Sequence, residues 1–212
     1  MSEAIEFYTN PMSRGQVVRW MLEEVGEPYD THILDYATTM KAEPYLSINP
    51  MGKVPAIRHR GKVVTEVAAI CCYLADAFPA AGLAPEPRDR ADYYRWIFFT
   101  SGPIEAAFSN KAAGFEPTPE RQRMFGYGNY DLAIGTLEKA LDGRRFIAGD
   151  RFTAADLFVG AMINFMLNFK LLDATPAFTD YATRVTNRDA YRRAQAIDGK
   201  LIAEMQAKQE AQ

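Results

Sequence analysis

Apolar and polar positions at the start of the chain follow two successive patterns. The first, from Ala4 to Tyr8, is that of a short strand, and the polar and proline residues 9–11 interrupt it. The apolar positions that follow recur at helical spacing, and they are Val17, Val18, Met21, Leu22 and Val25. We therefore predict a strand, a tight turn and a helix over Ser13 to Val25, with Gly26 as the helix stop.

The next pattern predicts a second strand. Tyr29 to Leu34 alternates between apolar and polar residues, after a connection that contains Gly26 and Pro28. Together with the first strand and helix it forms a βαβ unit. The following stretch, Asp35 to Ser47, is polar and contains Pro44, which favours an irregular crossover with a short helix.

A hairpin and a third helix complete the first half. Ala56 to His59 and Lys62 to Val64 are predicted strands, and Arg60-Gly61 is the turn between them. Thr65-Glu66 then opens a helix that runs to Phe78. This helix is apolar on nearly every side, so we expect it to be buried on more than one face.

The apolar pattern after residue 87 is helical only. Residues 79–87 contain three prolines and one glycine, which indicates a linker between a domain at 1–78 and an all-helical domain at 88–212. The expected helices of this second half are Arg88 to Asn110 with a bend at Gly102-Pro103, Glu120 to Leu141, and Phe158 to Phe169.

Two groups of polar residues in the second half have structural interpretations. Thr153 and Asp156 fit the N-cap and N3 positions of a capping box, and Phe152 and Leu157 fit the hydrophobic staple. Three arginines at four-residue spacing, expected on one later helix, favour a solvated face over an anion site; they are Arg184, Arg188 and Arg192.

Composition and charge narrow the class of partner. The 212 residues are 48% hydrophobic, enough for a sizeable core, and the net charge of −3 argues against a general binder of nucleic acid or of an anionic membrane. The N-terminus lacks the pattern of a secretory signal, and the apolar stretch 157–167 is too short to span a bilayer. We expect a cytoplasmic protein that binds a small molecule or another protein.

If the protein performs thiol chemistry, its cysteine usage indicates that the thiol comes from outside the chain. Cys71 and Cys72 are adjacent within the third helix, where core packing is the favoured role. They form neither a C-x-x-C redox motif nor a metal-ligand spacing, so we expect no metal and no permanently bound cofactor.

Ser13 lies where the first helix begins, and two roles are open to it. A serine at this position commonly caps the helix, but the same orphan N–H groups also attract an anion. A nucleophilic serine would need a base, and His32 and His59 lie on predicted strands with no acid nearby in sequence. A Ser-His hydrolase is therefore not expected.

Three motifs in series carry a family resemblance, and they are 8-YTNPMSR-14, 49-NPMGKVP-55 and 65-TEVAAI-70. The order β-α-β-α-β-β-α with a proline before the third strand resembles the thioredoxin-like fold. The motifs and the helical remainder resemble a cytosolic glutathione transferase of the bacterial, serine type over essentially the whole chain. The resemblance implies an α/β domain of thioredoxin-like fold followed by an all-α domain.

The resemblance also implies the residues of a glutathione site. Ser13 would donate a hydrogen bond to the glutathione sulfur, with Asn10 and Arg14 beside it to assist or replace it. The Val54-Pro55 bond would be cis and Val54 would pair its backbone with the cysteinyl part, although the dipeptide alone also allows an ordinary trans proline. The remaining implied contacts are Lys53, which is equally a solvated loop residue, and Glu66 and Val67 at the γ-glutamyl end.

One departure from the family pattern bears on affinity. Many members have Glu-Ser where this chain has Glu66-Val67, so one hydroxyl that helps to hold glutathione is absent. The backbone N–H of Val67 remains, and we expect binding at reduced affinity.

The function implied is conjugation. A glutathione transferase of this type activates the thiol of glutathione, its co-substrate, for attack on small hydrophobic electrophiles in detoxification, and transfers an alkyl or aryl group. Members of the family are usually dimeric, so we expect a homodimer, with no nucleic-acid or membrane partner. The aromatic residues of 93–108 are mostly core, but some can line an electrophile pocket. The candidates among them are Tyr94, Phe98 and Phe108, and Met12 is a further candidate. Peroxidase, isomerase or dehalogenase activity at the same site, or a non-catalytic binding or regulatory role, stays open as an alternative.

Overall fold

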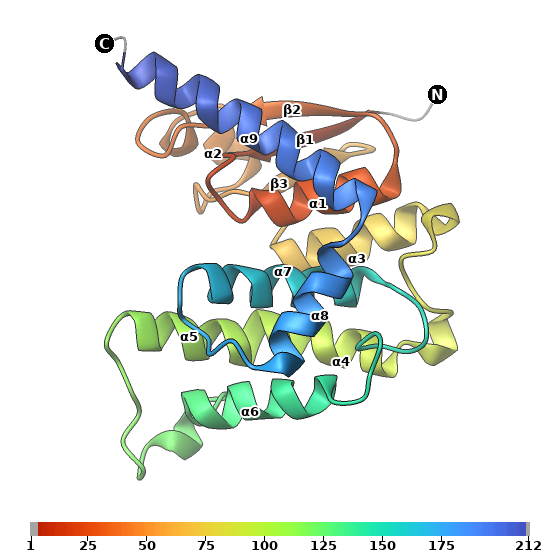
Figure 1. Cartoon of the computed structure of the whole chain (residues 1–212). Helices are drawn as coiled ribbons and strands as arrows, with labels where there is room; N and C mark the ends of the chain where they lie inside the picture. Colours follow the sequence, from red (N-terminus) through yellow and green to blue (C-terminus); the bar gives the residue numbers. More distant parts are fainter. Residues whose placement is uncertain (1–3, 211–212) are drawn as a thin grey trace. The chain divides into compact units, whose positions relative to one another are not determined.

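The computed structural model describes residues 4–210, and these form two compact units (Figure 1). The first unit contains the described part of Met1–Gly82 together with that of Arg188–Gln212, and the second is Leu83–Asn187. The boundary between the units at Gly82 and Leu83 falls within the expected linker 79–87. The expected helical domain over 88–212 is shorter in the structure, because the chain from Arg188 onward belongs with the first unit.

The first unit is built on a four-stranded sheet in the order β2-β1-β3-β4. The strands are β1 (Ile5–Thr9), β2 (Tyr29–Ile33), β3 (Ala56–His59) and β4 (Lys62–Thr65). β1 runs parallel to β2 and antiparallel to β3, and β3 and β4 form the expected hairpin. Arg60 and Gly61 both have positive φ, 50° and 69°, as a two-residue turn of this handedness requires.

The helices α1 (Gly15–Val25), α2 (Tyr45–Ile48) and α3 (Val67–Ala77) come after β1, β2 and β4, respectively, in the predicted order. α1 ends as expected at Gly26, which has φ 77° and donates its N–H to the Leu22 carbonyl. α2 is a single turn, in agreement with the irregular crossover predicted between the second and third strands. The thioredoxin-like order β-α-β-α-β-β-α is confirmed.

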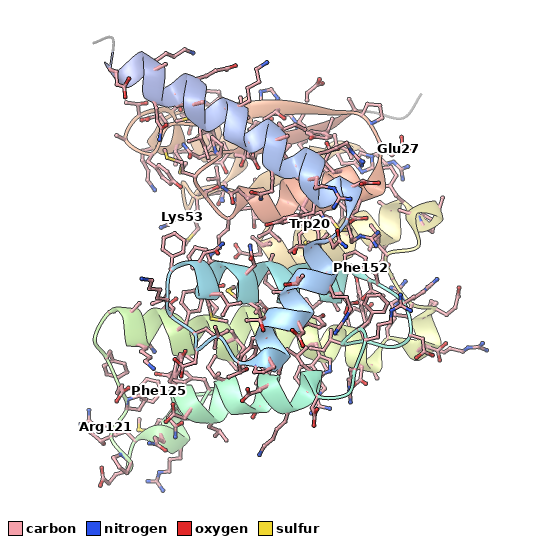
Figure 2. The ribbon with its side chains drawn as sticks, viewed as in Figure 1. Trp20, Glu27, Lys53, Arg121, Phe125 and Phe152 are labelled. Carbon is pink, nitrogen blue, oxygen red and sulfur yellow. The ribbon has the colours of Figure 1, made fainter. Side chains whose placement is uncertain are left out.

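The C-terminal helix α9 (Asp189–Glu210) packs on α1. Trp20 of α1, labelled in Figure 2, meets Tyr191 edge-on with 4.8 Å between the ring centroids. Ion pairs join α1 to α9 at Arg19–Asp198 (2.7 Å) and Glu23–Arg193 (2.9 Å), and Glu24 of α1 pairs with Arg188, the residue before α9, at 2.6 Å. α9 is therefore a structural part of the first unit.

The expectation that three arginines share one helix is wrong. Arg184 lies on α8, Arg188 precedes α9, and Arg192 lies on α9. The backbone at Asn187, with φ −76° and ψ 57°, leaves the helical region and separates the two helices. Arg192 has a local surface ion pair of the kind that a solvated helix face predicts, with Asp189 at 2.5 Å.

The second unit is helical, with α4 (Ala91–Phe99), α5 (Glu105–Ala112), α6 (Tyr130–Leu141), α7 (Ala154–Asn168) and α8 (Pro176–Thr186). Between α4 and α5, a π-helical segment over Thr100–Ile104 contains Gly102 and Pro103, where the sequence predicts the bend. The helix predicted over 120–141 is wrong before residue 130. Gly128 adopts φ 69° there, and the extended Asn129 caps α6 with its side chain.

The helix α7 is the core of the second unit and contacts α4 and α8. The predicted capping box is confirmed, with Asp156 accepting from the backbone and hydroxyl of Thr153, both at 2.9 Å. The same carboxylate also accepts from the Ile147 backbone at 2.7 Å and the Tyr181 hydroxyl at 2.8 Å. Leu157 beside it is fully buried. The start of α7 is therefore a hydrogen-bonded carboxylate surrounded by apolar side chains.

Candidate functional site

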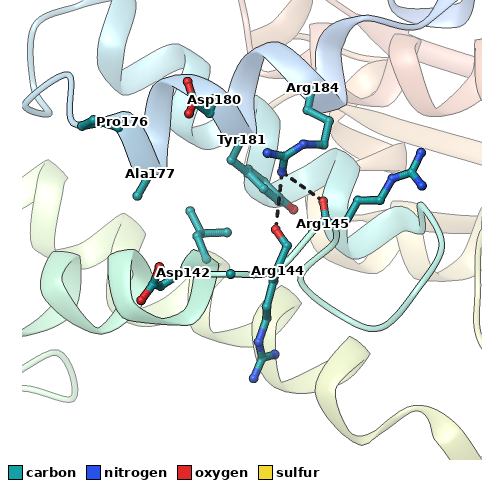
Figure 3. A pocket seen from close by; sticks show the side chains of 10 residues that line it. Asp142, Arg144, Arg145, Pro176, Ala177, Asp180, Tyr181 and Arg184 are labelled. Carbon is teal, nitrogen blue, oxygen red and sulfur yellow. Dashed lines mark hydrogen bonds between the residues drawn. The ribbon is translucent and has the colours of Figure 1, made fainter.

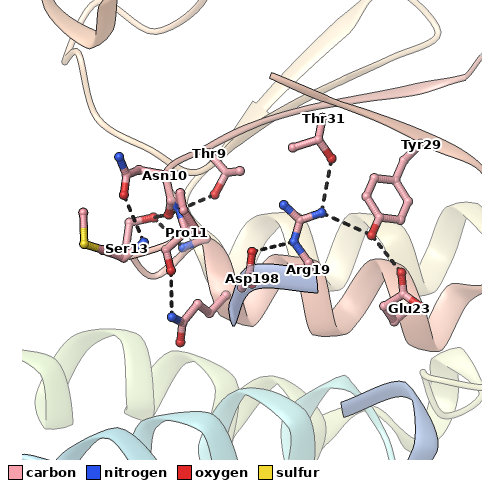
Figure 4. Close-up of polar contacts among 12 residues, drawn as sticks. Thr9, Asn10, Pro11, Ser13, Arg19, Glu23, Tyr29, Thr31 and Asp198 are labelled. Carbon is pink, nitrogen blue, oxygen red and sulfur yellow. Dashed lines mark hydrogen bonds and ion pairs between the residues drawn. The ribbon is translucent and has the colours of Figure 1, made fainter. Parts of the chain in front are cut away.

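The segment Thr9–Gly15 connects β1 to α1 and forms a tight hydrogen-bonded turn (Figure 4). The Asn10 carbonyl accepts from the backbone N–H of Ser13 at 2.9 Å and from its hydroxyl at 2.6 Å. The Ser13 oxygen in turn accepts from the N–H of Gly15 at 2.9 Å. Gly15 is required here, because a Cβ would lie 1.8 Å from the Thr9 hydroxyl oxygen.

The Ser13 hydroxyl therefore caps the start of α1, as one of the two interpretations of the sequence expects. Its proton points to the Asn10 carbonyl, which also receives the Ser13 N–H and, at 3.3 Å, the hydroxyl of Thr9. Rotation of the Ser13 proton toward a ligand would leave that carbonyl with two donors. The geometry thus permits Ser13 to cap α1 through its oxygen and to donate its proton elsewhere.

Asn10 is completely buried and holds this turn in place. Its amide nitrogen donates to the Leu34 carbonyl at 2.8 Å, and its amide oxygen accepts from the Met12 backbone at 2.9 Å. Arg14 immediately precedes α1 with helical backbone angles. The roles expected for Asn10 and Arg14 beside a sulfur stay predictions, and the observed contacts of Asn10 are those of a structural brace.

Tyr36 lies near Ser13, a proximity that no pattern in the sequence indicates. The Leu34 N–H donates to the Thr9 carbonyl at 2.8 Å, which ties the end of β2 to the turn before α1. Two residues later the chain reaches Tyr36, whose side chain is close enough to Ser13 for the Ser13 hydroxyl to lower the pKa of the Tyr36 phenol. Burial raises the pKa of Tyr36 above its usual range, against the smaller lowering by Ser13. A loop residue of this kind has no periodic signal that could reveal its neighbour.

The loop before β3 has the expected geometry, with a cis bond between Val54 and Pro55. The Lys53 carbonyl accepts from Asn49 at 2.8 Å and from the Tyr45 hydroxyl, which fixes the backbone just before that bond. The Lys53 side chain is exposed and labelled in Figure 2, while Val54 is half-buried and Pro55 is buried. Lys53 and Val54 as glutathione contacts stay predictions.

Glu66 stands at the start of α3 in an uncommon conformation, with φ 67° and ψ 121°. It is exposed, and its carbonyl accepts the first helical bond from Ile70 at 2.8 Å. Val67 is the first residue of α3, so its N–H is among those that have no partner within the helix. A strained non-glycine residue at a helix start suggests a binding position, because strain of this kind clusters at ligand sites.

The candidates for the electrophile pocket belong to both units. Met12 of the first unit is 52% exposed. In the second unit, Tyr94 and Phe98 are exposed neighbours on α4, with 6.4 Å between their ring centroids. Phe108 is buried and packs against Phe165 at 6.0 Å. The pocket assignment stays a prediction, and within their unit Tyr94 and Phe98 are more accessible than Phe108.

The cysteines and histidines have structural surroundings. Cys71 is fully buried, and burial raises the pKa of its thiol far above the usual range, so it stays a protonated core residue. The buried His59 contacts the Tyr73 hydroxyl at 2.9 Å. His32 lies 3.6 Å from Glu6, an acid that is distant in sequence, and its ring stacks on Tyr8.

A cavity of about 530 Å³ lies within the second unit (Figure 3). Its lining includes Arg184, which donates to the backbone carbonyls of Arg144 at 3.4 Å and Arg145 at 3.2 Å. Asp142 and Asp180 supply negative charge on the same lining. Arg184 is already hydrogen-bonded to backbone carbonyls, and the lining carries both positive and negative charges. This cavity therefore offers a less clear binding site than the turn before α1.

Within residues 4–210, no helix is long and apolar enough to cross a membrane. The same residues contain no group of three or more His, Cys, Asp or Glu side chains placed to hold a metal ion.

Two family models and a curated relative match this chain. The family model for the glutathione S-transferase N-terminal domain matches residues 12–77, and that for the C-terminal domain matches residues 120–187. A glutathione S-transferase of Xanthomonas campestris pv. campestris is 30% identical over 166 residues, which cover 73% of this chain and 79% of the relative.

Solved structures extend the likeness to nearly the whole chain. A sphingomonad glutathione S-transferase complexed with glutathione is 29% identical, with a TM-score of 0.75 and coverage of 92% of this chain and 98% of that one. A glutathione transferase from Methylococcus capsulatus str. Bath is 27% identical, with a TM-score of 0.77 and coverage of 92% and 99%. The predicted α/β domain of thioredoxin-like fold followed by a helical domain is confirmed. The chain belongs to the glutathione S-transferase family.

Proposed function

We propose that this protein binds glutathione in its first unit, stabilises the thiolate with Ser13, and conjugates it to a small hydrophobic electrophile. The observation that carries the proposal is the Ser13 hydroxyl at the start of α1, with its proton on a carbonyl that has two other donors. In the reaction, the thiolate sulfur forms a bond to an electrophilic carbon. The leaving group, or the carbon that becomes an anion in an addition, takes the displaced electron pair.

The energy needed is within reach of these groups. A free thiol has a pKa of about 8.5, and lowering it by two units requires about 2.7 kcal/mol of preferential stabilisation of the anion. A hydrogen bond to a charged acceptor contributes about 1.5–3 kcal/mol. The N-terminus of α1 adds about 0.3–1 kcal/mol. Ser13 and the helix start together therefore suffice without a base.

The rest of the tripeptide would lie along residues of the same unit. The backbone of Val54 next to the cis proline pairs with the cysteinyl part, and Glu66 with the N–H of Val67 holds the γ-glutamyl end. The strained backbone of Glu66 supports that position. The full set of proposed glutathione contacts is Asn10, Arg14, Lys53, Val54, Pro55, Glu66 and Val67.

The electrophile is proposed to meet Met12, Tyr94, Phe98 and Phe108. We further propose that the protein is a cytoplasmic homodimer without a permanently bound cofactor, as the family resemblance implies. Sedimentation of the purified protein tests the dimer directly. The relatives named glutathione S-transferases favour conjugation over the peroxidase, isomerase, dehalogenase and non-catalytic alternatives.

Replacement of Ser13 by alanine tests the proposal. In Ser13→Ala, the pKa of the bound glutathione thiol should rise by about 1–2 units, because a hydrogen bond of about 1.5–3 kcal/mol to the anion is lost. Ultraviolet absorbance of the bound thiolate as a function of pH measures this, and kcat/KM at neutral pH should fall about 10- to 100-fold.

Two controls make the result specific. Ser109→Ala removes an exposed hydroxyl from α5 and should leave the thiol pKa unchanged. Calorimetry with glutathione shows whether Ser13→Ala still binds the tripeptide, since the variant also loses a helix cap. A bound thiol with the same pKa in Ser13→Ala and in the parent protein removes Ser13 from the proposed role. A parent protein that binds no glutathione at millimolar concentration overturns the function itself.

A further inference from the structure

A second cavity, of about 400 Å³, lies within the first unit, on the face of the sheet opposite α1. Side chains alternate along β1, so Phe7 faces Arg19 of α1 while Tyr8 lies on the opposite face. There Tyr8 and Tyr45 belong to a small buried core, and both also line the cavity. The rest of the lining comes from β2 and from the segment that follows it, up to residue 48.

Aromatic rings form one wall of this cavity. The Tyr8 ring stacks on the His32 ring with 4.7 Å between the centroids and an interplanar angle of 15°, and it lies 5.7 Å from the Tyr45 ring. The larger apolar side chains of the remaining lining are Leu34, Pro44 and Ile48. Small molecules bind in concave, mostly apolar spaces of roughly 300–1,000 Å³ with a few polar groups. Aromatic faces attract both flat rings and cations.

A carboxylate gives the lining its negative charge. Glu43 is exposed and accepts the N–H of Ser47 at 3.1 Å, and the described residues that line the cavity include no lysine or arginine. Glu6 lies beside the aromatic wall, where the Tyr8 hydroxyl donates to it, but Arg58 binds this carboxylate at 2.7 and 2.6 Å and offsets its charge. The cavity thus combines aromatic faces with a negative group on its solvent side.

We propose that this cavity binds a protonated arylalkylamine, with its one or two fused rings against Tyr8 and Tyr45 and its ammonium group at the Glu43 carboxylate. The rings gain from burial of apolar surface, and the ammonium gains from the carboxylate and from the aromatic faces. An anionic aromatic molecule would instead be repelled by Glu43. The lining shares no residue with the proposed glutathione contacts, so this site is separate from the proposed function and does not depend on it.

Tryptamine is the probe, because it carries a two-ring indole and a protonated amine. In nuclear magnetic resonance spectra of the isotope-labelled full chain, tryptamine should shift the backbone amide signals of residues 38–48 and leave those of residues 13–15 and of Val67 unchanged. The shifts should persist with saturating S-hexylglutathione, which occupies a glutathione site together with the apolar pocket beside it. The absence of shifts at 38–48, or their loss when S-hexylglutathione is present, would overturn the proposal.

The role of Glu43 is tested with indole-3-acetate, which has the same ring system and the opposite charge. The parent protein should bind tryptamine more tightly than indole-3-acetate. In Glu43→Gln, which keeps an oxygen for the Ser47 N–H, affinity for tryptamine should fall about two- to fivefold, the range expected for an exposed ion pair, and affinity for indole-3-acetate should not fall.

Glu27→Gln is the matched control, since it removes an exposed charge from the connection between α1 and β2, and it should change neither affinity. Equal affinities of the parent protein for the two ligands contradict recognition of a cation. An unchanged ratio of the two affinities in Glu43→Gln likewise overturns the proposal.

The position of the ligand is tested with Ala42→Phe. Ala42 lines the cavity, is exposed and has an extended backbone, with φ −131° and ψ 164°, so a larger side chain is accommodated there without backbone strain. The added ring should fill the solvent side of the cavity and weaken tryptamine binding at least about tenfold. Circular dichroism checks that the variant is folded, and Glu43→Gln tests the site independently of it. Undiminished tryptamine binding by folded Ala42→Phe would place the ligand elsewhere and overturn the proposal.

Discussion

The ion pair between Arg19 of α1 and Asp198 of α9 is the most deeply buried charged contact between these helices, with the side chains 1% and 3% exposed. Arg19 also donates to the hydroxyls of Tyr29 at 3.3 Å and Thr31 at 3.2 Å, and its guanidinium lies 5.1 Å from the centroid of Phe7. The variant Asp198→Ala would remove the only anion in this set of contacts. It would leave a cation inside the first unit.

The expected cost follows from that burial. Removal of one partner of a buried pair costs about 3–5 kcal/mol, because the remaining charge has lost both water and counter-ion. This is a decrease of about two to four powers of ten in the folding equilibrium. The neighbouring pair Arg193–Glu23 is the internal control, since Arg193 is 55% exposed. Arg193→Gln should cost less than about 1 kcal/mol.

Chemical denaturation at one fixed protein concentration, followed by circular dichroism, measures the difference in free energy of unfolding. A second variant, Arg19→Met/Asp198→Leu, replaces both charges with apolar groups. Burial raises the pKa of Asp198 more than Arg19 lowers it, so desolvation of this carboxylate outweighs the attraction that Arg19 offers it. The double variant should therefore be more stable than Asp198→Ala. A loss below about 1 kcal/mol in Asp198→Ala, or a double variant less stable than it, would refute this reasoning.

Two further predictions concern the buried carboxylates. Because the folded-state pKa of Asp198 is raised above the usual 3.8, its contribution to stability is complete below that pH and is lost as the pH rises through the folded pKa. As the pH rises from 3.8 through the folded pKa of Asp198, the free energy of unfolding of the parent protein should fall relative to that of Arg19→Met/Asp198→Leu. A relative rise over this pH range would show that the pKa of Asp198 is lowered by folding. In the second unit, Asp156→Ala should cost at least about 3 kcal/mol, because it removes the α7 cap and leaves the buried donors of Ile147 and Thr153 without an acceptor. Thermal unfolding followed by circular dichroism measures this, and Asp156→Asn, which keeps one acceptor oxygen, should recover part of the loss.

Local patterns explain why much of the fold was predictable. Gly26 ends α1, Arg60-Gly61 turns the hairpin, and Thr153 with Asp156 starts α7, and each of these depends on residues a few positions apart. The α-helix predicted across 120–129 does not form, for a local reason too, because Gly128 and Asn129 start a helix at residue 130.

Contacts between distant segments were not predictable from one sequence. No pattern in the polar helix α9 predicts that it packs on α1. The paired residues Asp198 and Arg19 are separated by most of the chain, so no local spacing relates them. At the candidate site, the sequence marked Ser13 through its place at a helix start, and the motif spacing marked Val54 and Glu66. Tyr36 was missed because its position depends on how the loop after β2 folds back onto the turn before α1.

The late arrival of α9 has a consequence for biosynthesis. A ribosome releases α1 early, but the helix that neutralises its buried arginine emerges only after the whole second unit has been made. Until α9 is translated, the nascent first unit therefore lacks the counter-ion of Arg19 and the Tyr191 ring that packs on Trp20. A nascent chain arrested within α8 should accordingly be cleaved by protease in α1 and spared in the helices already packed around α7.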